Sequence, residues 1–102
     1  MSIGFALNEE YLYDECGVTI NGSFVDYPFP TALDLPSRSE FKSILAPDPL
    51  PDGPYGAKGV AESVTIPVAP AIGAAVYQAV GVRPEVMPMS AEKILQLIKG
   101  KG

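Results

Sequence analysis

Proline and glycine restrict what this chain can fold into more than any other feature. Its 102 residues include 11 prolines and 10 glycines, about a fifth of the chain and nearly double the usual share. Three prolines lie within residues 27–36, and four prolines and three glycines lie within 47–59. Each proline removes a backbone donor and disfavours helical geometry in the residue before it. We therefore expect 27–36 to lie extended against something larger, and 47–59 to form a surface loop or a loop held against a partner.

Three helices are predicted around these loops. Apolar residues in 3–7 have the spacing of one helical face and predict a short N-terminal helix that runs into a strand. Segment 70–80 begins with proline, keeps its apolar residues on one face and is followed by Gly81, which is typical of a helix and its C-cap. Ser90 is placed to begin a second C-terminal helix that ends at Gly100.

Four short segments have strand-like patterns. Segments 11–13 and 18–20 flank a polar four-residue stretch that ends in glycine, which predicts a β-hairpin. Segment 40–46 indicates another strand, and 64–68 is a β-like run interrupted by a proline. The expected fold class is therefore α+β: a small, fragment-like domain with short strands, long Pro/Gly-rich loops, two C-terminal helices and a discontinuous core.

Length and composition exclude several functions. A chain of this length can bury roughly two thirds of the surface that its unfolded form exposes, so a single domain is expected. The 12 acidic and 7 basic residues argue against nucleic acid as a partner, because that binding requires clustered cations. There is no histidine, and Cys16 is the single cysteine, so the chain offers no His/Cys zinc cluster, no intrachain disulfide and no Ser-His or Cys-His pair. The apolar stretch at the N-terminus is too short for a signal peptide and no run is long enough to span a membrane, so we expect a cytoplasmic protein.

One stretch carries candidate chemistry. Gly53, Gly56 and Gly59 are spaced around Lys58 and are followed by Glu62. Glycines let a backbone approach a ligand closely and present its amides. The spacing does not match a Walker phosphate loop, and no long strand and helix flank the stretch as in a dinucleotide-binding site. Taken by itself, such a glycine-rich stretch is usually only a turn.

The same stretch, GPYGAKGVAE (53–62), closely resembles the loop with the active-site glutamate in molybdenum hydroxylases, the xanthine dehydrogenase and aldehyde oxidase family. The resemblance continues through YPFPTALDLP (27–36) and through 3–10, 70–83 and 88–95, in the order found at the C-terminal end of the family's molybdopterin-binding subunit. Residues 1–102 therefore resemble the C-terminal part of a molybdopterin-binding domain. One position departs from the pattern: the family commonly has glycine before the glutamate, where this chain has Ala61.

The resemblance implies a role for each residue of the loop. Glu62 would be the catalytic base beside the molybdenum, and Gly56, Lys58 and Gly59 would bind the molybdopterin cofactor. Lys58 is also expected to donate a hydrogen bond to carbonyls of the loop. No residue would ligate the metal directly. Asp34, at a position that also resembles the family, is expected to bond the backbone of the proline-rich segment.

The shortness of the chain implies partners. Subunits of the family are several times longer, so we expect either a split subunit or a fragment that is inactive alone and shares its cofactor with a larger molybdopterin-binding chain. Iron-sulfur clusters and FAD would be carried by partner subunits. Uncovered apolar surface predicts that the isolated chain self-associates. The alternative is a non-catalytic interaction or assembly module derived from the family; the sequence does not identify a substrate.

Overall fold

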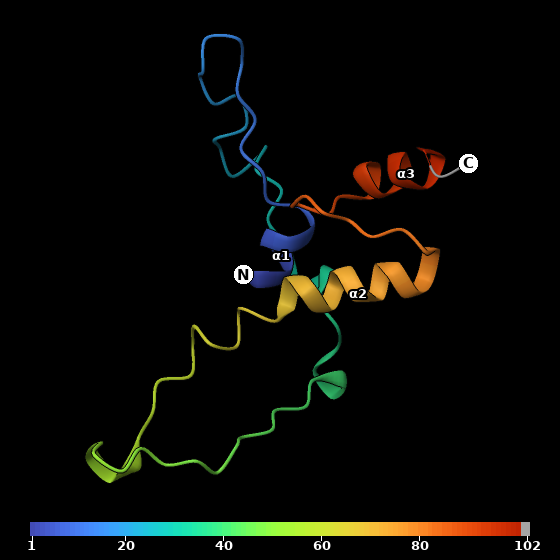
Figure 1. The fold of residues 1–102 in the computed structure, drawn as a ribbon. Helices are drawn as coiled ribbons and strands as arrows, with labels where there is room; N and C mark the ends of the chain where they lie inside the picture. The colour runs from blue at the N-terminus through green and yellow to red at the C-terminus, as the bar shows by residue number, and fades with distance from the viewer. Residues whose placement is uncertain (101–102) are drawn as a thin grey trace.

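The computed structural model describes residues 1–100 and shows three α-helices joined by long irregular segments (Figure 1). Three short 3-10 turns lie within those segments. The bounds are α1 (Ser2–Leu7), η1 (Ala32–Asp34), η2 (Arg38–Glu40), η3 (Pro54–Gly56), α2 (Val68–Val80) and α3 (Ala91–Gly100). None of the helices in this described part of the chain is long and apolar enough to cross a bilayer.

The expected strands do not form, so the α+β assignment is wrong in its β part. Within residues 1–100, the predicted hairpin is present as one antiparallel bridge between Tyr13 and Thr19, without extended strands. Two 2.9 Å backbone hydrogen bonds flank the bridge, from the N–H of Asp14 to the carbonyl of Val18 and from the N–H of Ile20 to the carbonyl of Leu12. Of segment 40–46, Glu40 ends η2 and 41–46 has no regular structure, while 64–67 forms turns and Val68 begins α2. A strand needs a neighbouring strand to satisfy its backbone, and these segments have none.

The predicted helices are confirmed. Helix α2 begins at Val68, two residues before the expected start, and ends where Gly81 adopts a left-handed φ of 70° and donates its N–H to the carbonyl of Tyr77 at 2.8 Å. Helix α3 follows Ser90, whose hydroxyl oxygen accepts a 3.4 Å hydrogen bond from the N–H of Lys93. Both ends follow the glycine and serine signals in the sequence.

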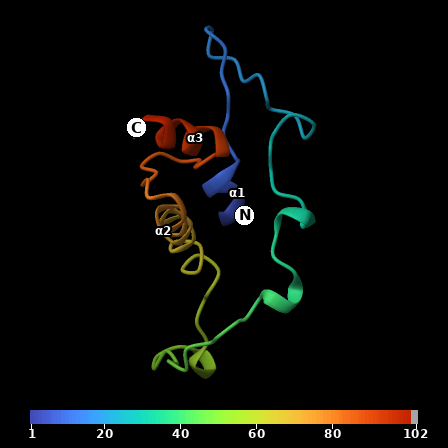
Figure 2. The same cartoon turned by 90° about the vertical axis from the view of Figure 1, so that its right-hand side faces the viewer.

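The core is a small contact between helices and linkers. Helix α1 packs against α2, and Met89, in the link before α3, donates its N–H to the carbonyl of Ala6 at 2.7 Å. Ala6, Val82, Pro88 and Met89 are the buried apolar side chains of the described residues. A salt bridge of 2.9 Å between Lys93 and Glu10 ties α3 to the segment after α1. The helices are thus grouped together, as Figure 2 also shows.

Polar contacts order the long segments locally. The buried side chain of Asn21 binds the backbone of 10–12 through two hydrogen bonds. Its Oδ1 accepts from the N–H of Leu12 at 2.8 Å, and its Nδ2 donates to the carbonyl of Glu10 at 2.7 Å. Asp34 accepts from both the hydroxyl and the N–H of Thr31, at 2.7 and 2.8 Å, as expected from the sequence. These two bonds lower the pKa of Asp34. The turn is therefore complete at neutral pH and loses these bonds as the pH falls through that lowered pKa.

The chain is far from compact. Its radius of gyration is 17.9 Å, against about 13 Å for a globular domain of this size. Its accessible surface is 8620 Å², against about 5,500 Å² for a folded monomer of this mass. The loop that carries η3 and the segment after α1 extend away from the helices in different directions (Figures 1 and 2).

The expected burial of two thirds of the surface is therefore not reached. An unfolded chain of this mass exposes about 15,700 Å², so the folded chain buries a little under half of that area. Large apolar side chains are exposed along the irregular segments, which confirms the predicted uncovered apolar surface. The most exposed among those of 20–50 are Leu33, Val25, Phe24, Leu45 and Ile44.

Candidate functional site

The glycine-rich stretch forms a closed turn at the tip of the longest loop. The N–H of Leu50 donates to the carbonyl of Gly56 at 3.1 Å, and the N–H of Gly53 donates back to the carbonyl of Leu50 at 3.2 Å. Within the turn, Tyr55 and Gly56 both have positive φ, 55° and 73°. Hydrogen bonds and backbone conformation therefore fix the shape of the tip without any apolar core.

Two glycines of the loop serve different purposes. Gly56 has a left-handed φ, and a Cβ there would lie 2.8 Å from the Cβ of Pro49, so the turn itself requires glycine at this position. Gly59 has no such φ, and a Cβ there would meet no atom within 4 Å. Nothing in the described chain requires glycine at position 59. A need for glycine there would therefore have to come from a molecule that binds at this position.

Lys58 joins the two arms of the loop. Its Nζ lies 2.6 Å from Oδ2 of Asp48, on the outgoing arm, and both side chains remain partly exposed. The expected hydrogen bond from Lys58 to loop carbonyls is therefore wrong in its acceptor, because the ammonium pairs with the Asp48 carboxylate instead. Sequence reasoning did not single out Asp48, since an aspartate between two prolines has no distinctive pattern.

The predicted cofactor-binding residues line a single hollow of about 600 Å³ between the two arms. Gly56, Lys58 and Gly59 come from the returning arm, and the outgoing arm supplies the opposite side. The remaining lining residues are Ile44, Leu45, Ala46, Pro47, Asp48, Pro49, Val60 and Ser63. The structure thus brings together three residues that the sequence grouped by motif alone.

Glu62 lies beside this hollow, at the start of the turns that lead into α2. Its backbone carbonyl accepts from the N–H and the hydroxyl of Thr65, at 3.0 and 2.7 Å, which fixes the backbone at this point. Its side chain is exposed, and within residues 1–100 its carboxylate makes no hydrogen bond or ion pair. Ala61 has no positive φ, so alanine fits here without strain. The carboxylate is available to a group outside this chain.

Backbone donors near Glu62 are also unpaired. The N–H groups from 58 to 64 donate no hydrogen bond within the described part of the chain. Unpaired amides are satisfied by water while exposed, and need acceptors once they are buried. The run of free amides beside an open glycine is therefore suited to a ligand rich in hydrogen-bond acceptors, and the free carboxylate is suited to accept a proton or a hydrogen bond.

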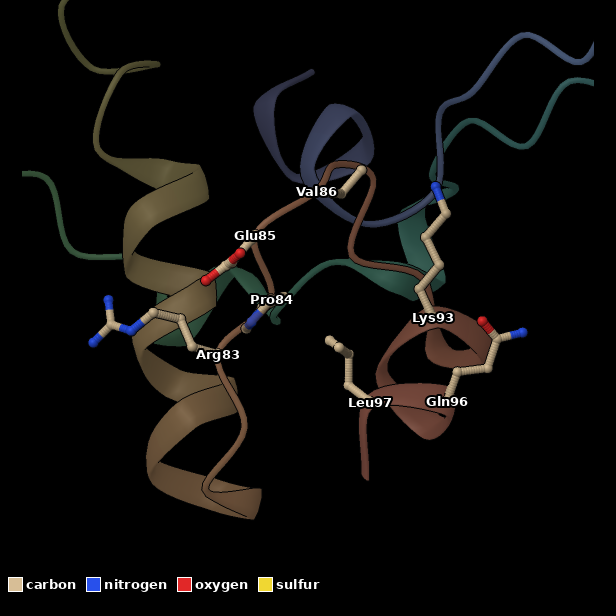
Figure 3. A pocket seen from close by; sticks show the side chains of 7 residues that line it. All are labelled: Arg83, Pro84, Glu85, Val86, Lys93, Gln96 and Leu97. Atoms are coloured by element: carbon tan, nitrogen blue, oxygen red, sulfur yellow. The ribbon is translucent and has the colours of Figure 1, made fainter. Parts of the chain in front are cut away.

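A second hollow, of about 670 Å³, lies between the α2–α3 link and α3 (Figure 3). Its cationic side chains are already engaged: Lys93 pairs with Glu10, and the guanidinium of Arg83 lies 5.1 Å from the ring centre of Tyr77. The other lining residues are Pro84, Glu85, Val86, Gln96 and Leu97. None of the predicted site residues lies here, so this hollow is not the candidate site.

Known proteins resemble the chain over nearly its full length. The gamma subunit of the 6-hydroxypseudooxynicotine dehydrogenase complex of Paenarthrobacter nicotinovorans is 39% identical over 100 residues, 96% of this chain and 12% of that protein. A putative xanthine dehydrogenase molybdenum-binding subunit of Escherichia coli is 39% identical over 98 residues, again 12% of its length.

A solved structure agrees with these relatives. Quinoline 2-oxidoreductase from Pseudomonas putida 86 matches 96% of this chain with a TM-score of 0.82 and 34% identity, and the match covers 12% of that chain. No protein-family model matches the sequence. The chain thus spans about an eighth of the length of the proteins it resembles.

Proposed function

We propose that this chain supplies the loop 53–62, with Glu62 as base, to the molybdenum site of an oxidoreductase of the xanthine dehydrogenase and aldehyde oxidase family. Over nearly its whole length, the chain is homologous to a segment of the molybdenum-binding subunits of that family. The observation that carries the role is the exposed and unpaired Glu62 carboxylate beside a hollow lined by Gly56, Lys58 and Gly59. Residues 1–102 act as the C-terminal part of the molybdopterin-binding domain.

The loop fits the cofactor that this function requires. When bound, a molybdenum-molybdopterin group supplies two-electron redox chemistry. Its pterin and phosphate are rich in hydrogen-bond acceptors, which suits the free amides from 58 to 64. Gly59 leaves space for close approach, whereas the Lys58 ammonium already pairs with Asp48. Gly56, Lys58 and Gly59 would contact the organic part of the cofactor, and Glu62 would face the ligands of the metal.

Glu62 has the chemistry of a proton acceptor. Its carboxylate has no competing donor among residues 1–100, and the two bonds from Thr65 to its carbonyl hold the backbone in place. General bases work when they are held within hydrogen-bond reach of the proton they remove. The role of the loop is therefore to present one carboxylate oxygen to the reacting group and to receive the proton there.

The rest of the enzyme lies outside this chain. The chain corresponds to about an eighth of its relatives, and the hollow has walls from one loop alone. A larger molybdopterin-binding chain would complete the site, so residues 1–102 would be inactive alone. Cluster ligation takes four cysteines as a rule, and this chain has one. Iron-sulfur clusters and FAD would therefore be carried by partner subunits.

Purification from the native host tests this function. A tag on this chain at its own locus should recover about one molybdenum atom per chain, together with a large co-purifying polypeptide. Metal analysis and intact mass measure both. A metal-free chain recovered alone, or only with copies of itself, would contradict the proposal.

A pair of glycine substitutions tests the loop. Gly59→Ala should leave the structure of this chain unchanged, because the added Cβ meets nothing, and should lower the molybdenum content of the purified assembly if the cofactor approaches there. Gly56→Ala should destabilise the turn by about 1–2 kcal/mol, because it forces a left-handed φ on alanine. Equal molybdenum content in Gly59→Ala and wild type would remove the argument for contact at position 59.

A further inference from the structure

Tyr55 is presented at the tip of the loop in an unusual way. Its side chain is fully exposed, and its backbone has φ 55° and ψ 18°, a left-handed conformation that residues other than glycine rarely adopt. It is the only described residue other than glycine with positive φ. Two hydrogen bonds that span Tyr55 hold this conformation. The N–H of Gly56 donates to the carbonyl of Gly53 and the N–H of Ala57 donates to the carbonyl of Pro54, both at 3.0 Å.

No side-chain contact within residues 1–100 accounts for this conformation. The ring of Tyr55 takes part in none of the aromatic or cation-π contacts of the described chain, and its hydroxyl makes no hydrogen bond there. Unfavourable backbone conformations persist at binding and catalytic sites, where they position a group for its task. The disfavoured backbone conformation of Tyr55 therefore holds a large, exposed aromatic side chain where it can contact another molecule.

The surface of the chain indicates what that molecule is. The chain exposes about 3,000 Å² more than a folded monomer of its mass would, while a standard interface takes about 800 Å² from each partner. It also spans about 12% of its relatives. Both facts point to a large protein surface, such as the remaining part of a molybdenum-binding subunit, rather than to a small ligand.

We propose that Tyr55 anchors the loop 53–62 in the larger molybdenum-binding chain, with its ring in an apolar pocket and its hydroxyl directed to a polar group at the pocket's end. The inference rests on the proposed function. Tyrosine buries a large area while ordering only two side-chain torsions, which suits it as an interface anchor. Gly56 follows Tyr55 directly and Lys58 is two residues further along. Binding of the Tyr55 ring would therefore set the position of the hollow and of Glu62.

Competition in the host tests the anchor. An untagged wild-type chain and a Tyr55 variant are expressed in the same cells at equal levels. The assembly is captured through its large chain, and intact mass gives the ratio of the two chains incorporated into it. Tyr55→Gly removes the ring but suits the left-handed backbone, so the turn itself is preserved. It should be incorporated about 30-fold less than wild type. Tyr55→Phe keeps the ring and should stay within about threefold of wild type.

The possible outcomes separate the two proposals. If the wild-type chain captures no large molybdenum-binding chain, the proposed function fails. If it does, and Tyr55→Gly is incorporated as well as wild type, the anchor alone is overturned. If Tyr55→Gly is incorporated as well as wild type but the assembly that contains it has a raised KM for substrate, the ring contacts substrate, and the anchor is also overturned.

Discussion

Replacing Glu62 with glutamine should lower the turnover of the assembled enzyme by about 10²- to 10⁴-fold, the usual contribution of a general base, and should leave assembly and molybdenum content unchanged. The amide has the shape of the carboxylate but does not accept the proton. Assembly is spared because Glu62 is exposed and its carboxylate has no partner in the described chain, and such surface substitutions change stability by about 0.5 kcal/mol or less.

The measurement is kcat per molybdenum atom in the assembly purified through this chain. The substrate would be the most active among aldehydes and aromatic nitrogen heterocycles, with a dye as electron acceptor. Glu85→Gln is the matched control, since Glu85 is also an exposed glutamate but lines the other hollow, beside α3. Full activity in Glu62→Gln would support the alternative function, a non-catalytic assembly module.

The isolated chain should show no cooperative, concentration-independent thermal transition and should self-associate. It buries a little under half of the surface of its unfolded form, and its buried apolar side chains within residues 1–100 are Ala6, Val82, Pro88 and Met89. Binding to the large chain should create such a transition, because a partner that binds only the folded form stabilises it.

Circular dichroism melts over a hundredfold concentration range, together with sedimentation velocity, measure both properties. The purified assembly serves as the comparison. A sharp melt at one temperature across the whole range, from a monomer in sedimentation, would show that this chain is a self-sufficient domain.

Helices were the part of the fold that the sequence predicted well. Gly81 and Ser90 mark helix ends through local hydrogen bonds and backbone conformation, which depend on a few neighbouring residues. Segments 40–46 and 64–68 had strand-like composition but formed no strands, since pairing depends on a neighbour that no local pattern specifies. Their exposed apolar residues show that apolar composition does not by itself place a side chain in the chain's own core.

For the candidate site, Gly56, Lys58 and Gly59, which the motif predicted to bind the cofactor, line one hollow. It did not find Asp48 as the partner of Lys58, because the ion pair spans ten positions and depends on the path of the loop. The backbone conformation of Tyr55 was also missed, since nothing in its residue type indicates a positive φ. The roles of Glu62 and of the three cofactor-binding residues remain predictions.

A cryo-electron microscopy map of the assembly purified through this chain tests the central proposal most directly. We predict that an oxygen of the Glu62 carboxylate lies within hydrogen-bond reach, roughly 3 Å, of the ligands of the molybdenum in a site completed by a larger chain. Glu62 in solvent, or against protein far from any molybdenum, would contradict the account.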